Sequence, residues 1–143
     1  MKVAWIRMTI AAALFAGLAT GCAATGASHE TDITLIRMKP NPNRISLTGG
    51  MEGVIEVRQG CTYLVSKHNG AAVLMIWPSS YELWRQDGRA IGLLNNTTGQ
   101  TLKFGVNARF GGGDATHLPA SELETPIPSN CNGPSYTAEF ASP

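Results

Sequence analysis

The sequence predicts an all-β domain, a small antiparallel barrel that is closed or partly open and contains little helix. Three observations lead to this fold class. Short apolar runs alternate with polar residues at the two-residue period of strands, and no long window has the helical period. The dipeptides Asn69-Gly70 and Asp87-Gly88 separate such runs, where they favour hairpin turns. A barrel is favoured over a sandwich because closure removes exposed strand edges.

The domain is expected to begin with short strands. Residues 33–36 form the first candidate, and the turn-rich segment 40–43 ends it. Residues 45–47 alternate between apolar and polar side chains and form a second candidate. Residues 54–58 place two apolar side chains on one face and two charged side chains on the other, as a half-buried strand does.

A buried hairpin is expected next. Residues 61–66 form its first strand, and Asn69-Gly70 supplies the turn. The returning segment 72–77 is apolar throughout, so both of its faces should be covered and it should be a central strand. Pro78 ends it.

A second hairpin follows from residues 81–85 and 89–94, joined at Asp87-Gly88, with a turn at 95–100. Residues 102–106 alternate and predict one more half-buried strand. One helical turn is expected over residues 119–123, because Pro119 suits a first helical position.

The last part of the domain is expected to be mostly loop. The triple glycine at residues 111–113 interrupts the strand pattern, and four prolines follow before residue 135. Residues 136–140 alternate again and predict a final strand. The five principal strands fall within residues 53–107, which makes an OB-like barrel the specific expectation.

Composition indicates one soluble globular domain. Residues 22–143 number 122, enough for a hydrophobic core. Without Lys2 and Arg7, nine basic residues stand against ten acidic ones, for a net charge of −1 with histidine neutral. The charges are scattered and form no basic stripe, so no nucleic-acid partner is expected.

The first 22 residues resemble a bacterial lipoprotein signal peptide. A basic start with Lys2 and Arg7 precedes an apolar run over residues 10–18, which is too short to span a bilayer. Three small residues then lead directly to Cys22. One departure is that the usual leucine lies one place early, and the alternative is an ordinary signal peptide that is cut nearby.

The resemblance implies that residues 1–21 are removed and that lipid attached to Cys22 anchors the protein in a membrane. Residues 22–31 are small and polar and are expected to form a flexible tether before a single domain at 32–143. Ala23 follows the cysteine in place of the aspartate that retains lipoproteins in the inner membrane. The expected location is therefore the cell envelope, at the outer membrane in an organism with two membranes.

Cys61 and Cys131 remain as an even pair if Cys22 carries lipid, and an exported protein lies in an oxidising compartment. A disulfide between them is expected, and the alternative is two buried free thiols. Neither cysteine has a second ligand at the spacing of a zinc site, so no metal or other cofactor is expected.

A second resemblance concerns the domain. The motifs that carry it are Gly60-Cys61, Trp77-Pro78, Asp87-Gly88, the triple glycine and the segment 131–134. Together they resemble small exported bacterial proteins that have no assigned function. The resemblance covers most of residues 53–140, and it implies a fold and a disulfide but no activity.

The candidate binding surface combines aromatic and polar residues. Tyr81 and Trp84 could stack on a sugar or peptide, with packing in the core as the alternative, whereas Trp77 is expected in the core. Asp114 and His117 follow the triple glycine and could bind a metal or share a proton, but two ligands make no catalytic metal site, and the alternative is a solvated loop.

The predicted function is that of a lipid-anchored envelope protein, a binding or structural module without catalysis. Its expected contacts are the membrane, through the lipid on Cys22, and an envelope protein or glycan. The alternative is an envelope hydrolase or enzyme inhibitor with its site in the loop over residues 111–117. Catalysis is not favoured, because the sequence has no G-x-S-x-G motif and Cys61 is better explained by a disulfide.

Overall fold

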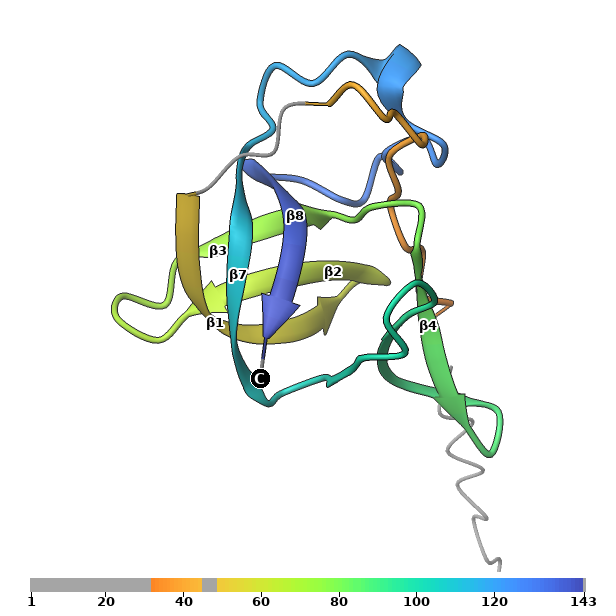
Figure 1. Ribbon diagram of the computed structural model, residues 1–143. Helices are drawn as coiled ribbons and strands as arrows, with labels where there is room; N and C mark the ends of the chain where they lie inside the picture. The colour runs from red at the N-terminus through yellow and green to blue at the C-terminus, as the bar shows by residue number, and fades with distance from the viewer. Residues whose placement is uncertain (1–31, 45–48, 143) are drawn as a thin grey trace, which may run out of the picture.

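The computed structural model describes residues 32–44 and 49–142 and confirms the all-β class (Figure 1). The predicted signal peptide, Cys22, the tether and the candidate strand 45–47 lie outside these residues. The described elements are β1 (Gly49–Arg58), β2 (Cys61–Ser66), β3 (Ala72–Ile76), β4 (Tyr81–Gln86), β5 (Arg89–Asn95), β6 (Thr101–Lys103), β7 (Asn107–Asp114), a 3₁₀ turn η1 (Ala120–Glu122) and β8 (Ser135–Ser142).

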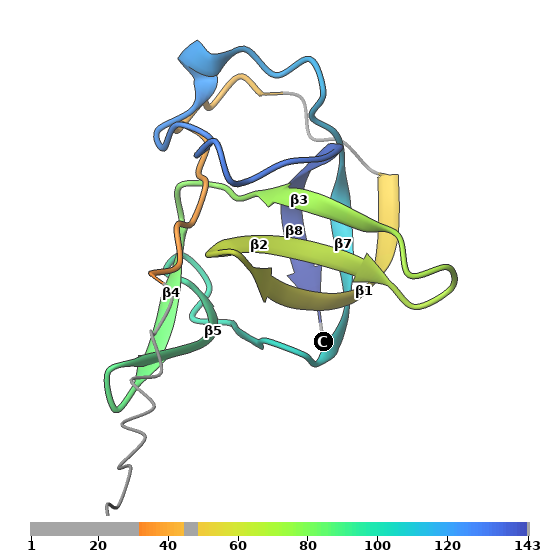
Figure 2. The same ribbon diagram turned by 180° about the vertical axis from the view of Figure 1, so that it is seen from behind.

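Five strands form a closed barrel in the order β1-β2-β3-β8-β7 (Figure 2). The β3–β8 pair is parallel, and the other four pairs are antiparallel. Counted along the chain, the fifth barrel strand therefore lies between the third and the fourth. This order confirms the OB-like expectation.

The barrel strands are not those expected from the sequence, however. The second hairpin and the segment after it leave the barrel and form a separate three-stranded sheet, β4-β5-β6. Their apolar side chains still join the barrel core, because Tyr81, Leu93 and Leu102 pack into it. The alternation along these strands thus reports burial correctly but does not identify the partner strand. The hairpin turn itself is confirmed, with φ angles of 51° at Asp87 and 81° at Gly88.

The triple glycine continues a strand, and the expectation that it interrupts one is wrong. Gly111, Gly112 and Gly113 belong to β7 and pair with β8, with a register shift between Gly111 and Gly112. A Cβ atom on Gly112 would lie 1.7 Å from the backbone oxygen of Thr137. Glycine is required because the strands approach too closely here for any side chain.

The predicted strand at residues 102–106 is also wrong beyond its first part. β6 ends at Lys103, and the chain turns at Gly105, whose φ is 75°. The N–H of Gly105 donates to the oxygen of Ile55 at 2.9 Å, which attaches this turn to the barrel. Val106 is consequently 47% exposed.

The segment at residues 33–36 is not a regular strand. Thr34 makes an isolated bridge with Cys61, and the next isolated bridge, Arg37 with Trp77, comes directly after the segment. The segment runs along the outer face of the barrel, where it meets the ends of β2 and β3 rather than a full strand edge.

Two cores lie on opposite faces of the barrel wall because side chains alternate along each strand. The inner core contains Ile55, Leu64 and Met75, each no more than 1% exposed, and Trp77 at 0% as expected. The outer core is covered by the N-terminal segment and the long loop between β7 and β8. It consists of Ile36, Met38, Cys61, Tyr63, Leu74, Ile76, Ala115, Leu123 and Cys131.

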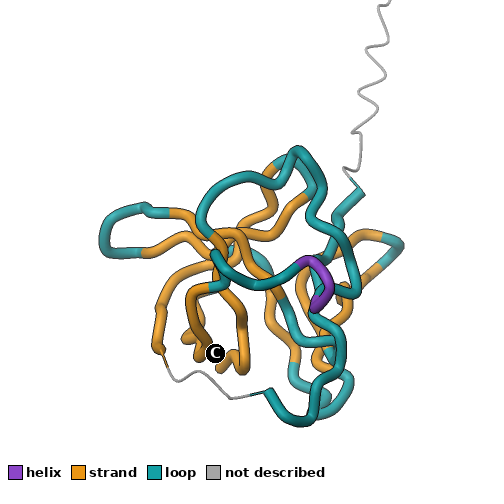
Figure 3. The backbone as a smooth tube through the Cα atoms, turned by 90° about the horizontal axis from the view of Figure 1, so that it is seen from above, coloured by secondary structure: helices purple, strands orange, loops and turns teal. Residues whose placement is uncertain are grey.

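The disulfide between Cys61 and Cys131 is confirmed, with Cα atoms 5.7 Å apart and the two residues 70 positions apart in sequence. It attaches the long loop to the start of β2. The same loop carries the single turn η1, at the position where one was expected (Figure 3).

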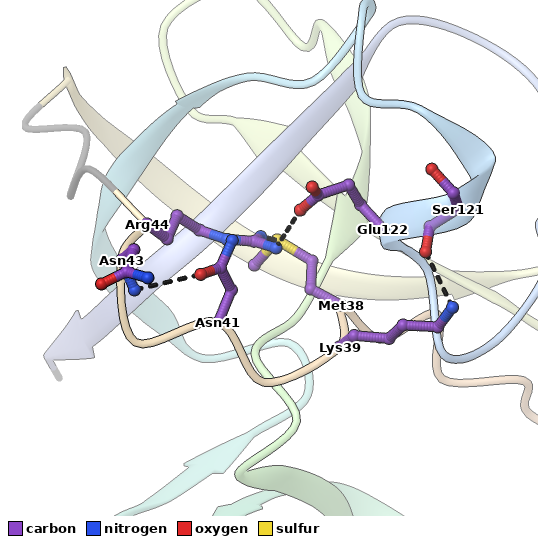
Figure 4. Close-up of polar contacts among 7 residues, drawn as sticks. All are labelled: Met38, Lys39, Asn41, Asn43, Arg44, Ser121 and Glu122. Carbon is purple, nitrogen blue, oxygen red and sulfur yellow. Dashed lines mark hydrogen bonds and ion pairs between the residues drawn. The ribbon is translucent and has the colours of Figure 1, made fainter.

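Polar contacts close the outer core from above (Figure 4). The Lys39 ammonium donates to the oxygen of Ser121 at 2.8 Å, and Arg44 pairs with Glu122 at 2.7 Å. Arg44 also contacts the sulfur of Met38. The N-terminal segment is thereby bound to η1 over the buried apolar layer.

Candidate functional site

A cavity of about 560 Å³ opens at the end of the barrel where β1 begins and the β2–β3 hairpin turns. We call it the barrel mouth. In Figure 1 this end carries the first residues of β1 and the hairpin after β2. The lining residues are Gly50, Met51, Glu52, Ser66, His68, Arg109 and Phe110.

The floor of the barrel mouth is apolar. Met51 and Phe110 are opposite one another in the β1–β7 ladder, so both side chains point into the barrel. Phe110 is 1% exposed and Met51 is partly buried against the inner core. Ser66 and His68 supply polar groups beside this floor.

Glu52 carries the negative charge of the rim. Because it follows Met51 on β1, it points outward, opposite Arg109. Its carboxylate accepts a hydrogen bond from Asn107 Nδ2 at 2.9 Å and lies 3.6 Å from Arg109 Nε. The Asn107 hydrogen bond is the largest cause of a lowered pKa at Glu52, and Arg109, Lys67 and His68 lower this pKa further. Glu52 therefore stays ionised in mildly acidic conditions.

The amide of Asn107 is held mainly by this contact. Its Oδ1 atom is buried and accepts no hydrogen bond within residues 32–44 and 49–142. The bond from Nδ2 to Glu52 is thus the interaction that orients the side chain. Asn107 in turn orients the Glu52 carboxylate. Arg109, on the other side of that carboxylate, is 78% exposed and lies at the outer rim.

Replacement of Glu52 with glutamine is expected to flatten the pH dependence of stability. The pKa of Glu52 is lower in the folded state, so its ionised form stabilises the fold fully above the ordinary value of 4.5 and progressively less as pH falls through the lowered pKa. Denaturation at pH 7 and pH 3 measures this, and the E52Q variant should lose less stability than wild type between them. Equal losses would contradict the assigned interaction.

The predicted aromatic residues do not form one surface. Tyr81 is 2% exposed and packs on Trp77 with ring centroids 5.2 Å apart, so its ring belongs to the core. Trp84 is half-buried on β4, in the separate three-stranded sheet. Only Trp84 of this pair therefore reaches solvent.

Asp114 and His117 lie elsewhere, where the chain leaves β7. The Asp114 carboxylate accepts the N–H of Thr116 at 2.7 Å, and hydrogen bonding by Thr116 is the main cause of a lowered pKa at Asp114. His117 is exposed and lowers this pKa slightly. Figures 1 and 2 show β4 and the end of β7 on different sides of the molecule, so the four predicted residues are not brought together.

Sequence reasoning missed the barrel mouth. Glu52 and Arg109 are ordinary strand residues 57 positions apart, and only the β1–β7 pairing brings them together. One signal could have pointed to it, because the alternation predicted for residues 54–58 puts Met51 on the same face as Ile55 when it is extended back along the chain.

Two kinds of feature are absent from the described part of the chain. Residues 32–44 and 49–142 hold no group of three or more His, Cys, Asp or Glu side chains that could bind a metal ion. In the same residues, no helix has the length and apolar character needed to cross a membrane.

Comparison of the chain with protein-family models, with curated proteins and with solved structures found no match. The assignment of the OB-like barrel therefore depends on its own strand order.

Proposed function

We propose that this protein is a lipid-anchored binding module of the cell envelope, with Cys22 as its lipidated residue and the barrel mouth as its binding site. The disulfide carries the first part of the proposal. It joins two of the three cysteines of the chain to each other and not to Cys22, and structural disulfides are typical of exported proteins. Because Ala23 follows Cys22, the proposed location in an organism with two membranes is the outer membrane.

The composition of the barrel mouth supports the second part. An apolar floor at Met51 and Phe110 lies below a rim with both charge signs, Glu52 and Arg109. Binding sites commonly combine an apolar surface with a few polar groups that fix orientation. The proposed ligand is an envelope peptide segment or glycan, both of which present apolar faces and hydrogen-bonding groups.

Site-specific photo-crosslinking in intact cells tests both parts. A photoreactive residue at His68, on the rim, should give one dominant adduct that the R109E substitution abolishes. The same residue at Thr97, an exposed turn position outside the barrel mouth, should give none. The C22S variant should leave the membrane fraction and lose the adduct, because the anchor brings the site to its ligand.

The outcomes separate the two parts. Retention of the C22S variant in the membrane fraction would contradict lipid anchoring at Cys22. Equal crosslinking from positions 68 and 97, or an adduct that persists with R109E, would contradict the barrel mouth as the binding site.

A further inference from the structure

A second pocket lies where the chain enters the domain, at the opposite end of the molecule from the barrel mouth. We call it the N-terminal pocket. In Figures 1 and 2 the first described residues lie beside the β4–β5 hairpin, away from the β2–β3 hairpin. The pocket has a volume of about 440 Å³ and is lined by Asp32, Ile33, Val57, Arg85, Gly88, Arg89, Ala90 and Phe104.

The length of chain before this pocket limits its distance from a membrane. Nine residues, 23–31, lie between Cys22 and the first pocket residue, Asp32, so the connection is ten residue steps long. Even fully extended, ten residues span at most about 35 Å. A lipid on Cys22 would therefore hold the N-terminal pocket near the leaflet surface, whereas the barrel mouth lies at the far end of the domain.

The charges of the pocket suit an anionic group. The lining includes the guanidinium groups of Arg85 and Arg89 and the carboxylate of Asp32, and Arg85 already has partners of its own, so the group offered to an anion is Arg89. Arg85 donates to the oxygen of Gly88 at 3.0 Å, which holds it along the hairpin. Arg89 is exposed and has no polar partner among the described residues. Guanidinium groups bind phosphate with paired hydrogen bonds.

The remaining lining suits the border between headgroups and acyl chains. Ile33, Val57 and Phe104 add an apolar wall beside the two arginines. The arginines lie on a paired hairpin next to the chain entrance, because β4 pairs with β5 from Tyr81 to Gln86, with a register shift between Trp84 and Arg85.

We propose that the N-terminal pocket binds the phosphate of an anionic phospholipid, whose headgroup carries no cation of its own, in the leaflet that holds the anchor. The β4–β5 hairpin then lies on the membrane and the barrel mouth points away from it, toward its ligand. This orientation rests on the proposed lipidation of Cys22, but binding by the pocket can be measured without it.

The first experiment uses the C22S protein, residues 22–143, and vesicles of phosphatidylcholine with or without phosphatidylglycerol. Binding should require the anionic lipid, and R89E should weaken it about tenfold, because each cation near such a surface contributes roughly a factor of five and reversal also adds repulsion. K67E, the same charge change on the opposite hairpin, is the matched control and should change binding less than twofold. Near-ultraviolet circular dichroism checks that both variants fold.

Three results would overturn headgroup binding. These are equal binding to both vesicle types, equal effects of R89E and K67E, and Arg89-dependent binding of inorganic phosphate without binding of vesicles. None of them bears on Cys22, so they are distinguishable from a failure of the anchor.

The second experiment measures orientation in the lipidated protein, after mass spectrometry has confirmed lipid on Cys22. A fluorophore on D87C, at the tip of the β4–β5 hairpin, should be quenched by headgroup-labelled nitroxide lipid at least threefold more than one on N69C, at the tip of the opposite hairpin. R89E should remove this difference. Equal quenching at the two tips would overturn the orientation.

Discussion

Replacement of both Cys61 and Cys131 with alanine is expected to lower the free energy of unfolding by about 4 kcal/mol. The disulfide closes a loop of 70 residues in sequence separation, and the chain-entropy estimate for a loop of this size gives that value. Both positions are buried, at 0% and 5% exposure, so the loss of the bond also opens the outer core. Urea denaturation of the C22S protein, with and without the two alanines, measures the difference.

The damage should be uneven across the molecule. The loop that carries η1 is held by the disulfide and by the contacts of Lys39 and Arg44, whereas the inner core does not contain either cysteine. Hydrogen exchange should therefore accelerate most in the loop after β7 and least in β1 and β2 away from Cys61. A loss below about 1 kcal/mol, or uniform acceleration, would contradict this account.

The G112A substitution is expected to destabilise the fold by about 3 kcal/mol, at the upper end of the usual cost of overpacking. The added Cβ atom would lie 1.7 Å from the oxygen of Thr137, which is backbone and cannot rotate away. The β7–β8 pair must separate locally, and this separation weakens the closure of the barrel. Thermal or urea denaturation in parallel with wild type measures the effect.

Gly50 provides the matched control. It lies on β1 opposite Gly111, one position from the Gly49–Gly112 pair, but a Cβ atom there would meet nothing within 4 Å. The G50A variant should stay within about 0.5 kcal/mol of wild type. Equal effects of the two substitutions would mean that close strand approach is not what glycine provides in β7.

The candidate site illustrates what local patterns could and could not supply. Alternation predicted that Ile55 faces a core, and the same rule places Met51 on that face. It could not reveal that Phe110 completes the floor or that Arg109 lies opposite Glu52, because the partner strand is more than 50 residues away. Tyr81 failed as a surface candidate for a related reason, since the sheet that carries it packs onto the barrel end.

The sequence by itself determined the features that depend on neighbouring residues. Asn69-Gly70 between apolar runs predicted the buried hairpin of β2 and β3, and Asp87-Gly88 predicted the hairpin of β4 and β5. The two-residue period predicted the last strand, β8. The even pair of cysteines in the domain specified the disulfide. The strands and turns follow from interactions within a few residues of sequence. The disulfide follows because two cysteines in one domain allow only one pairing.

Only the tertiary structure decided which strands share a sheet. β4, β5 and β6 alternate as barrel strands would, yet they form a second sheet, and the barrel closes through β7 and β8. The physical reason is that backbone hydrogen bonds are alike in every strand, so pairing depends on whole surfaces fitting together. β7 must approach both β1 and β8 closely, and its glycines allow this approach. The barrel that closes in this way has the barrel mouth at its end.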